Sequence, residues 1–138
     1  MSDYVLDSGI LIRHLRDQRG YPELVDHLTD KADVYISAMT RLEVVRGMRD
    51  REREDTFNLI DSLETISITG ELADSAGEII RSWRGRGITL SDADAIIAAS
   101  AIHRGLALVT TNAKHFPMPE LIVFQADEQG HLSPAPRT

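Results

Sequence analysis

Four polar side chains have the chemistry of a metal site: the carboxylates of Asp7, Glu43 and Asp94 and the amide of Asn112. Each lies directly beside an apolar segment, which tends to draw the polar group inward. Carboxylates that are buried together repel one another and lose their hydration, so a cluster of them is unstable without a cation. A hard divalent ion with oxygen ligands resolves this conflict. The sequence therefore predicts a metal-dependent hydrolase.

Each of these residues also has a purely structural interpretation. Asp7 suits the cap of a helix that begins near residue 9, and Asn112 suits a tight turn. Glu43 stands between Leu42 and Val44 and could form a structural ion pair with Arg46 or with Arg86.

Two acids, Asp92 and Asp94, open a predicted apolar helix, where capping and the helix dipole favour carboxylates. Asp94 precedes the apolar stripe of Ile97, Ala98 and Ala101, which is expected to face the sheet. Asp94 is therefore predicted to point towards the edge of the sheet. Asp92 is the better candidate for the cap, or for an outer contact to the metal.

The residues around the acids are candidates for contacting a substrate. Serine and threonine hydroxyls near the strand ends could orient a phosphate, and basic side chains could bind one. The alternative for the basic clusters is a solvated helix face, because acids are interleaved with them. The candidates for substrate binding are Ser8, Arg41, Arg46, Thr111 and Lys114.

The composition limits the possible classes of protein. A length of 138 residues suits one domain, and 42% hydrophobic residues is ordinary for a folded protein. The absence of cysteine excludes disulfides and thiolate chemistry. A net charge of −7 argues weakly against a general nucleic-acid binder, although acids in a metal site would account for part of it. The sequence shows no secretory signal and no membrane span, so a cytoplasmic protein is expected.

Helical and strand patterns alternate along the chain, which predicts βαβ units and a mainly parallel five-stranded sheet sandwiched by helices. A single domain is expected over residues 1–126, followed by a weakly ordered tail over 127–138. The predicted strands are 4–6, 34–36, 66–68, 106–109 and 121–124, and the predicted helices are 9–16, 22–30, 51–64, 70–84 and 92–104. A further helix is expected after a cap at Ser37 or Thr40, with Leu42, Val45 and Met48 at helical spacing.

The topology predicts where the polar residues meet. Asp7 follows the first strand and Asn112 follows the fourth, so both emerge at the carboxyl edge of a parallel sheet. Ligands bind at this edge in such folds. Glu43 and Asp94 lie in helices entered from loops, so both can face the same edge.

Four segments together resemble the motifs of the PIN domain family. The first is Leu6-Asp7-Ser8, and the second places Glu43 before Gly47 in the stretch 37–47. The third is Asp92-Ala93-Asp94 with the following apolar run, and the fourth is the stretch 109–116 around Asn112. Any one motif is weakly specific, but four in order at suitable spacing form a strong signal. The compact length is similar to that of the toxins of VapBC-type toxin–antitoxin pairs.

The resemblance implies more than the residues alone. It implies a Mg²⁺- or Mn²⁺-dependent endoribonuclease acting on tRNA or rRNA, with Asp7, Glu43 and Asp94 as metal ligands. It also implies a homodimer that is inhibited by a VapB-like antitoxin. Binding to operator DNA would occur only indirectly, through the antitoxin. The fourth position is often Asp in this family and is Asn112 here, which would weaken a second metal site.

Other classes fit less well. A haloacid dehalogenase-like phosphotransferase needs a second Asp where Gly9 stands, and no P-loop motif occurs. A receiver domain needs an early acidic pair that the chain lacks, and flap nucleases are normally larger. The serious alternative is a catalytically degenerate PIN-type module that binds RNA or a protein, for which Asn112 is the only hint in the sequence.

Overall fold

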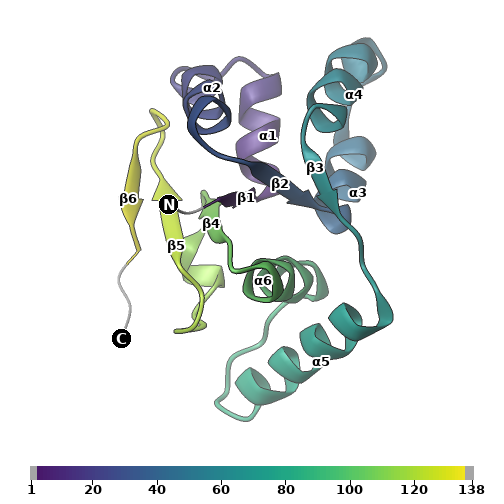
Figure 1. Cartoon of the computed structure of the whole chain (residues 1–138), viewed down its shortest axis with the longest axis vertical. Helices are drawn as coiled ribbons and strands as arrows, with labels where there is room; N and C mark the ends of the chain where they lie inside the picture. Colours follow the sequence, from purple (N-terminus) through teal and green to yellow (C-terminus); the bar gives the residue numbers. More distant parts are fainter. Residues whose placement is uncertain (1–2, 136–138) are drawn as a thin grey trace.

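The chain forms a twisted six-stranded sheet with helices on both faces, as seen in the computed structural model, which describes residues 3–135 (Figure 1). The order of the strands is β3-β2-β1-β4-β5-β6, and all neighbours are parallel except β5 and β6. The strands are β1 (Tyr4–Leu6), β2 (Val34–Ser37), β3 (Glu64–Ile66), β4 (Ala107–Thr110), β5 (Val123–Ala126) and β6 (Leu132–Pro134). The helices are α1 (Ser8–Leu15), α2 (Tyr21–Lys31), α3 (Ala38–Gly47), α4 (Arg53–Asp61), α5 (Gly70–Arg84) and α6 (Asp92–Arg104), with short 3₁₀ turns η1 (Asp50–Glu52) and η2 (Ala113–His115).

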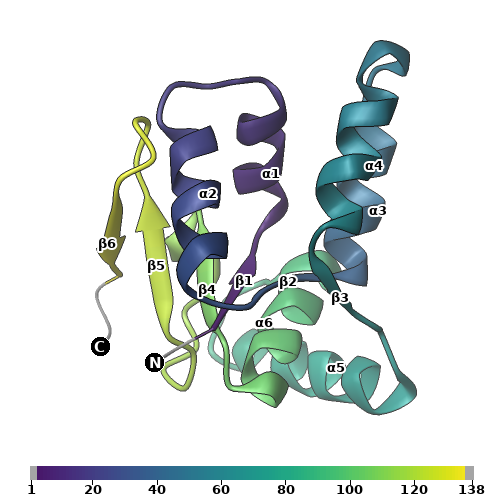
Figure 2. The same cartoon turned by 45° about the horizontal axis from the view of Figure 1, so that its top comes forward.

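Two apolar layers hold the helices against the sheet. On one face, α1 to α4 pack over the strand residues Leu6, Ile36 and Val109. On the other face, α5 and α6 pack over Val5 and Leu108 (Figures 1 and 2). Successive residues of β1 and β4 thus point to opposite cores, and burial on both faces explains why these strands are apolar without alternation. The predicted α/β architecture is confirmed.

The helices begin and end where the local chemistry requires. Ser37, Thr69 and Ser91 cap α3, α5 and α6 by accepting hydrogen bonds from backbone N–H groups of the first turn. Gly105 ends α6 in the left-handed conformation, with φ of 63°. The bounds of α5 and α6 are those that the sequence predicts.

Several elements have bounds that differ from those predicted. β4 covers Ala107–Thr110 rather than 106–109, and α4 covers Arg53–Asp61 rather than 51–64. Two other strands are displaced by two residues along the chain. β3 covers Glu64–Ile66 rather than 66–68, because its pairing with β2 buries Ile66 and leaves Ile68 exposed. β5 covers Val123–Ala126 rather than 121–124. An apolar stretch is compatible with more than one choice of strand bounds, and the pairing with the neighbouring strand decides which residues form the strand.

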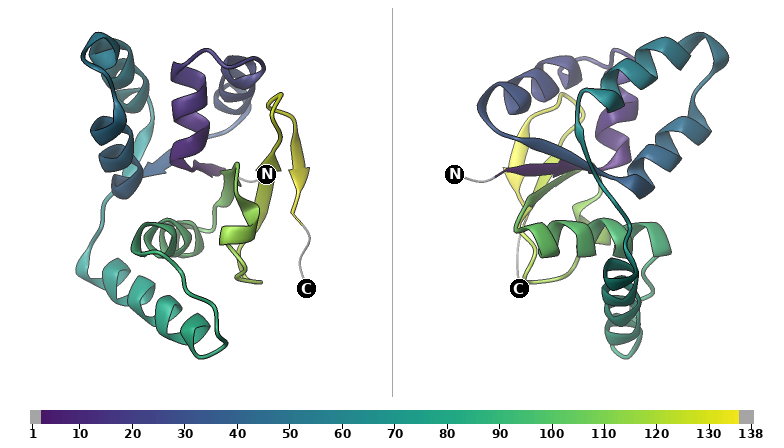
Figure 3. Two further views of the ribbon diagram at one scale, coloured as in Figure 1. Left: turned by 180° about the vertical axis from the view of Figure 1, so that it is seen from behind. Right: turned by 45° about the vertical axis from the view of Figure 1, so that its right-hand side comes forward.

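The expected five-stranded sheet is corrected to six strands, since β6 lies within the segment that the sequence suggests is weakly ordered. β6 pairs antiparallel with β5 at the edge of the sheet, which Figure 3 shows from two further sides. The turn between them is closed by Asp127, whose Oδ1 accepts from the N–H groups of Gln129 and His131 at 2.9 Å each. This short strand is held by tertiary pairing, which its own sequence does not reveal. Residues 136–138 of the predicted tail lie outside the described residues.

The turn between β5 and β6 packs against the loop between α1 and α2 at two glycines. Gly20 has φ of 89°, and a Cβ there would lie 1.7 Å from the carbonyl oxygen of Gln129. A Cβ on Gly130 would lie 2.6 Å from the carbonyl oxygen of Gly20. The two backbones can approach this closely only because both positions lack a side chain. No helix in residues 3–135 is long and apolar enough to cross a membrane.

We expect Gly20→Ala to lower the free energy of unfolding by at least about 2 kcal/mol, because the substitution adds both a backbone strain and a clash with main-chain atoms. Gly77→Ala, within α5, is the matched control. A Cβ there meets nothing within 4 Å, so this variant should be stabilised by up to about 1 kcal/mol. Urea denaturation of both variants measures the difference. Equal stability of the two variants would contradict the close approach.

Candidate active site

Asp7 lies at the junction of β1 and α1, where it caps the helix and faces β4. Its Oδ1 accepts a hydrogen bond from the N–H of Ser8 at 2.8 Å, and its Oδ2 accepts from the hydroxyl of Thr110 at 2.8 Å. Burial raises the pKa of Asp7, the two hydrogen bonds lower it, and the nearby charge of Asp94 raises it again. Asp7 thus caps α1, as its structural interpretation predicts, and its carboxylate also lies beside the other acids.

Thr110 joins the two strand ends that form the floor of the site. It is fully buried at the end of β4, and its hydroxyl oxygen also accepts a hydrogen bond from the N–H of Asn112 at 3.0 Å. Leu6 pairs with Val109 across the sheet, so this register brings Thr110 beside Asp7. The sequence places the hydroxyls of Thr110 and Thr111 at a strand end, where either could orient a water or a phosphate. The strand pairing adds that Thr110 is bonded to Asp7.

Glu43 reaches the site from α3 and is half-buried. Burial raises its pKa, followed by the charges of Asp7 and Asp94, while a hydrogen bond with Ser8 and the charge of Arg46 lower it. Its Oε1 is buried without a hydrogen-bond partner in the described part of the chain. Such an atom is costly to bury unless something compensates it. Neither of the structural ion pairs considered from the sequence forms among residues 3–135.

Asp94 enters from the first turn of α6. The cap of this helix is Ser91, whose hydroxyl accepts from the N–H of Asp94 at 3.1 Å, so the carboxylate of Asp94 is not used for capping. Its Oδ2 lies 3.5 Å from Nδ1 of His115, which follows Asn112 in η2. Asp94 raises the pKa of both Asp7 and Glu43, so the three acids form one electrostatic cluster.

Three other residues that the sequence predicts for the site are exposed on the surface of the protein. Asp92 is exposed beside a shallow hollow of α5, and it is not among the charges that shift Asp7 or Glu43. Asn112 is exposed just after β4, with its backbone N–H held by Thr110. Lys114 is exposed in η2, next to the site.

Two further candidates for substrate contact, Thr111 and Arg46, stay close to the acids. Thr111 is half-buried, and a Cβ added at Gly9 would lie 2.8 Å from its Oγ1, so the first turn of α1 lies close against the segment after β4. Arg46 is exposed one turn after Glu43, on which its charge acts. The absence of a side chain at Gly9 therefore permits this close approach of α1 to Thr111.

Arg41 is engaged by α4 and β3 and is not among the charges that shift the pKa of Asp7 or Glu43, so its contact with substrate stays a prediction. Its guanidinium donates to the carboxylate of Asp61 at 2.9 Å, to the carbonyl of Ile60 at 3.2 Å and to the hydroxyl of Thr65 at 3.3 Å. These bonds tie α3 to the end of α4 and to the edge strand β3. The side chain is engaged in holding the fold, which a cluster of basic residues in a sequence does not show.

The carboxylates fit a hard divalent ion. The donors are oxygens, two of the acids have raised pKa values through burial and mutual repulsion, and Glu43 Oε1 lacks a partner. In residues 3–135, no three acidic or histidine side chains stand close enough to enclose an ion directly. Mg²⁺ suits such an open site, because it keeps several waters and needs only one or two carboxylates.

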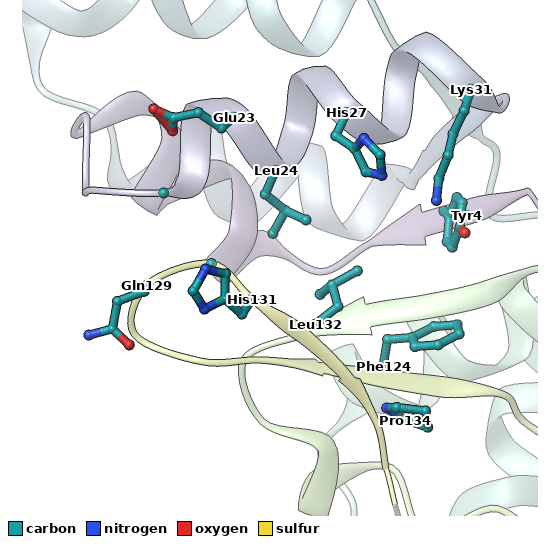
Figure 4. A pocket seen from close by; sticks show the side chains of 12 residues that line it. Tyr4, Glu23, Leu24, His27, Lys31, Phe124, Gln129, His131, Leu132 and Pro134 are labelled. Atoms are coloured by element: carbon teal, nitrogen blue, oxygen red, sulfur yellow. The ribbon is translucent and has the colours of Figure 1, made fainter.

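A hollow of about 680 Å³ lies away from the acids, between α2 and the β5–β6 hairpin (Figure 4). Leu24, His27, Phe124 and Leu132 line it, and none of the three acids does. The acids instead occupy an open edge of the sheet. Size alone therefore does not identify the site in this protein.

Comparison with known proteins agrees with the fold. The PIN domain model matches residues 4–118. Ribonuclease VapC10 of Mycobacterium tuberculosis is 32% identical over 116 residues, which cover 84% of this chain and 87% of that protein. Ribonuclease VapC1 of Methanocaldococcus jannaschii is 31% identical over 116 residues, covering 83% and 79%. The chain belongs to the PIN domain family, among its VapC-type members.

Solved structures of the same fold come from toxin–antitoxin complexes. DNA-bound VapBC from Salmonella typhimurium matches with a TM-score of 0.77 at 23% identity, covering 89% of this chain and 97% of that one. VapBC2 from Rickettsia felis, bound to a promoter DNA fragment, matches with a TM-score of 0.73 at 22% identity, covering 87% and 96%.

The buried acids make the stability of the metal-free protein depend on pH. A carboxyl whose pKa is raised by folding favours the folded state below its usual pKa and opposes it as pH rises through the raised value. We expect Glu43→Gln to be more stable than the wild type at pH 7 without metal, with the gain disappearing below about the ordinary carboxyl pKa of 4.5. Thermal unfolding across pH 3.5–8 in EDTA is the measurement.

Glu54→Gln is the control, since Glu54 is an exposed acid of α4. It should leave the pH dependence of stability unchanged. A Glu43→Gln variant that is less stable than the wild type at pH 7 in EDTA would show that the Glu43 carboxylate is not destabilised by its neighbours.

Proposed function

We propose that the protein is a Mg²⁺- or Mn²⁺-dependent endoribonuclease, the toxin of a VapBC-type pair, acting on tRNA or rRNA in the cytoplasm. The observation that carries the proposal is the electrostatic cluster of Asp7, Glu43 and Asp94 at the carboxyl edge of the sheet, with Glu43 Oε1 lacking a partner. The names of the sequence relatives, which are ribonucleases, support the choice of RNA as substrate.

The three carboxylates would hold the ion, directly or through water. Asn112 would orient the water bound to the ion, and Asp92 would contact the ion's water shell from outside the cluster of three acids. When bound, the ion supplies Lewis acidity, which lowers the pKa of water and neutralises charge on the reacting phosphate. No side chain of the cluster is an obvious general base, which favours direct hydrolysis by water. The products would then carry 5′-phosphate and 3′-hydroxyl ends.

The neighbouring residues of the chain have roles that follow from their contacts. The backbone N–H of Ser8 and the hydroxyl of Thr110 fix both oxygens of Asp7, so this carboxylate has a defined orientation before any ion binds. Arg46 and Lys114 are exposed beside the acids and would bind RNA phosphates. Basic contacts of this kind position the substrate without reading its sequence.

We also propose a VapB-like antitoxin as the protein partner and a homodimer as the assembly. Structures of similar fold are VapBC complexes, two of them with DNA, which supports an antitoxin partner and contact with operator DNA only through it. The net charge of −7 favours this indirect route, since the chain itself offers little general attraction to duplex phosphate.

The proposal is tested by cleavage of tRNA and rRNA with purified protein that is free of antitoxin. We expect discrete fragments with Mg²⁺ or Mn²⁺ and none with EDTA. Asp7→Asn and Asp94→Asn should each reduce the rate by at least about 100-fold, because even the outer partners of a metal site contribute 10- to 100-fold. Asp30→Asn, an exposed acid of α2, is the matched control and should cleave as the wild type does.

The fragment ends test the mechanism separately. Products with 2′,3′-cyclic phosphate would contradict hydrolysis by water, since they require attack by the 2′-hydroxyl of the RNA itself. If metal-loaded protein cleaves neither RNA, the second candidate function holds, a non-cleaving PIN-type module that binds RNA or a protein. Its supporting observation is the uncharged Asn112 at the fourth position, and Asn112→Asp would be the first variant to test for restored cleavage.

A further inference from the structure

One side chain of β5 holds the backbone on both sides of Asn112. The Oε1 of Gln125 accepts a hydrogen bond from the N–H of Ala113 at 2.8 Å. Its Nε2 donates to the carbonyl of Thr111 at 2.8 Å and to the carbonyl of Ala126 at 2.8 Å. All three hydrogen bonds of the carboxamide are therefore made with main-chain groups. Two of these main-chain groups belong to Thr111 and Ala113, the residues that flank Asn112.

The same segment is held from β4 by Thr110. Its hydroxyl oxygen accepts from the N–H of Asn112 at 3.0 Å and its hydroxyl donates to Oδ2 of Asp7 at 2.8 Å. A continuous chain of hydrogen bonds therefore runs from Gln125 through the backbone of Asn112 to the carboxylate of Asp7. Such chains fix the orientation of the groups at their ends.

The backbone here has little regular structure to hold it. Asn112 has φ of −136° and ψ of 62°, outside both helix and strand, and only the three-residue turn η2 follows. Buried or half-buried backbone groups outside a ladder must find other partners. Gln125 supplies the partner for the N–H of Ala113 and for the carbonyl of Thr111.

We propose that Gln125 is a positioning residue of the active site, which fixes the segment that carries Asn112 relative to the carboxylate of Asp7. The inference rests on the proposed function, because the position of Asn112 matters for chemistry only if an ion is held there. Gln125 itself touches no reacting group and acts through the main chain. Partners that orient metal-binding groups in this way contribute about 10-fold or more to metal affinity.

Glutamine is the residue that matches all three partners. A glutamate would set a carboxylate oxygen against the carbonyls of Thr111 and Ala126, which repel it, and would add a charge near the acids. An asparagine is shorter by one methylene and cannot span the same partners. A methionine has a similar volume but forms none of the three bonds.

The experiment compares Gln125→Met with Gln18→Met. Gln18 is the matched control, because its Nε2 also donates to a distant carbonyl, that of Glu128 at 3.1 Å, away from the acids. Mn²⁺ affinity is measured by calorimetry, and the backbone amide signals of residues 110–113 are measured by NMR in EDTA. We expect Gln125→Met to bind Mn²⁺ about 10-fold more weakly and to shift these signals. Gln18→Met should do neither.

Wild-type Mn²⁺ affinity in Gln125→Met would overturn the inference, as would an equal loss in both variants, because Gln125 would then be a general structural residue. If Gln125→Met does not fold, Gln125→Asn provides the same comparison with a polar side chain. If the wild type itself binds no Mn²⁺, the proposed function fails, and the metal-free amide signals still decide the positioning role. Unchanged signals for residues 110–113 in the variant would refute it.

Discussion

The proposed site depends on one unfavourable interaction, the mutual repulsion of three carboxylates at the edge of a parallel sheet, and the rest of the fold must tolerate it. Asp7 and Glu43 are drawn into partly buried positions by apolar neighbours, and Asp94 adds to the repulsion that each of them meets. The fold tolerates this cost because the two apolar cores on either face of the sheet supply the stabilisation. The destabilised arrangement is one that a divalent cation would relieve.

Neutral hydrogen-bond donors offset only part of the repulsion. Ser8 and Thr110 each donate to one oxygen of the Asp7 carboxylate, whereas Glu43 keeps one buried oxygen without a partner in the described chain. Full neutralisation by arginine is avoided, although arginines are abundant in α3 and nearby. Arg41 is directed away into the contact with Asp61, and Arg46 remains exposed. The cluster therefore keeps its negative potential, which is what a cation site requires.

The sequence predicts the elements better than it predicts their contacts. The three acids are identifiable because a carboxylate inside an apolar segment is itself unusual, and α5 and α6 are predicted to the residue because both have caps and long apolar stripes. The existence of β6 and the bounds of β3 are not predictable in this way, because each is determined by hydrogen bonding with the neighbouring strand. Gln125 is missed for the same reason, and so is the bond between Thr110 and Asp7, because these contacts depend on strand pairing across 12 and 103 residues of sequence respectively. Local sequence patterns thus identify the candidate acids, whereas the pairing of the strands identifies the residues that hold these acids and Asn112 in place.

The most direct test of the account is a double-mutant cycle on the metal-free protein, with Asp7→Asn, Glu43→Gln and the combined variant unfolded in urea at pH 7. If the two acids repel each other, each single substitution removes the same repulsion. The double variant should then gain less stability than the sum of the two single changes, and saturating Mn²⁺ should stabilise the wild type most. Strictly additive effects without metal, with no preferential stabilisation of the wild type by Mn²⁺, would contradict the existence of a coupled acidic site.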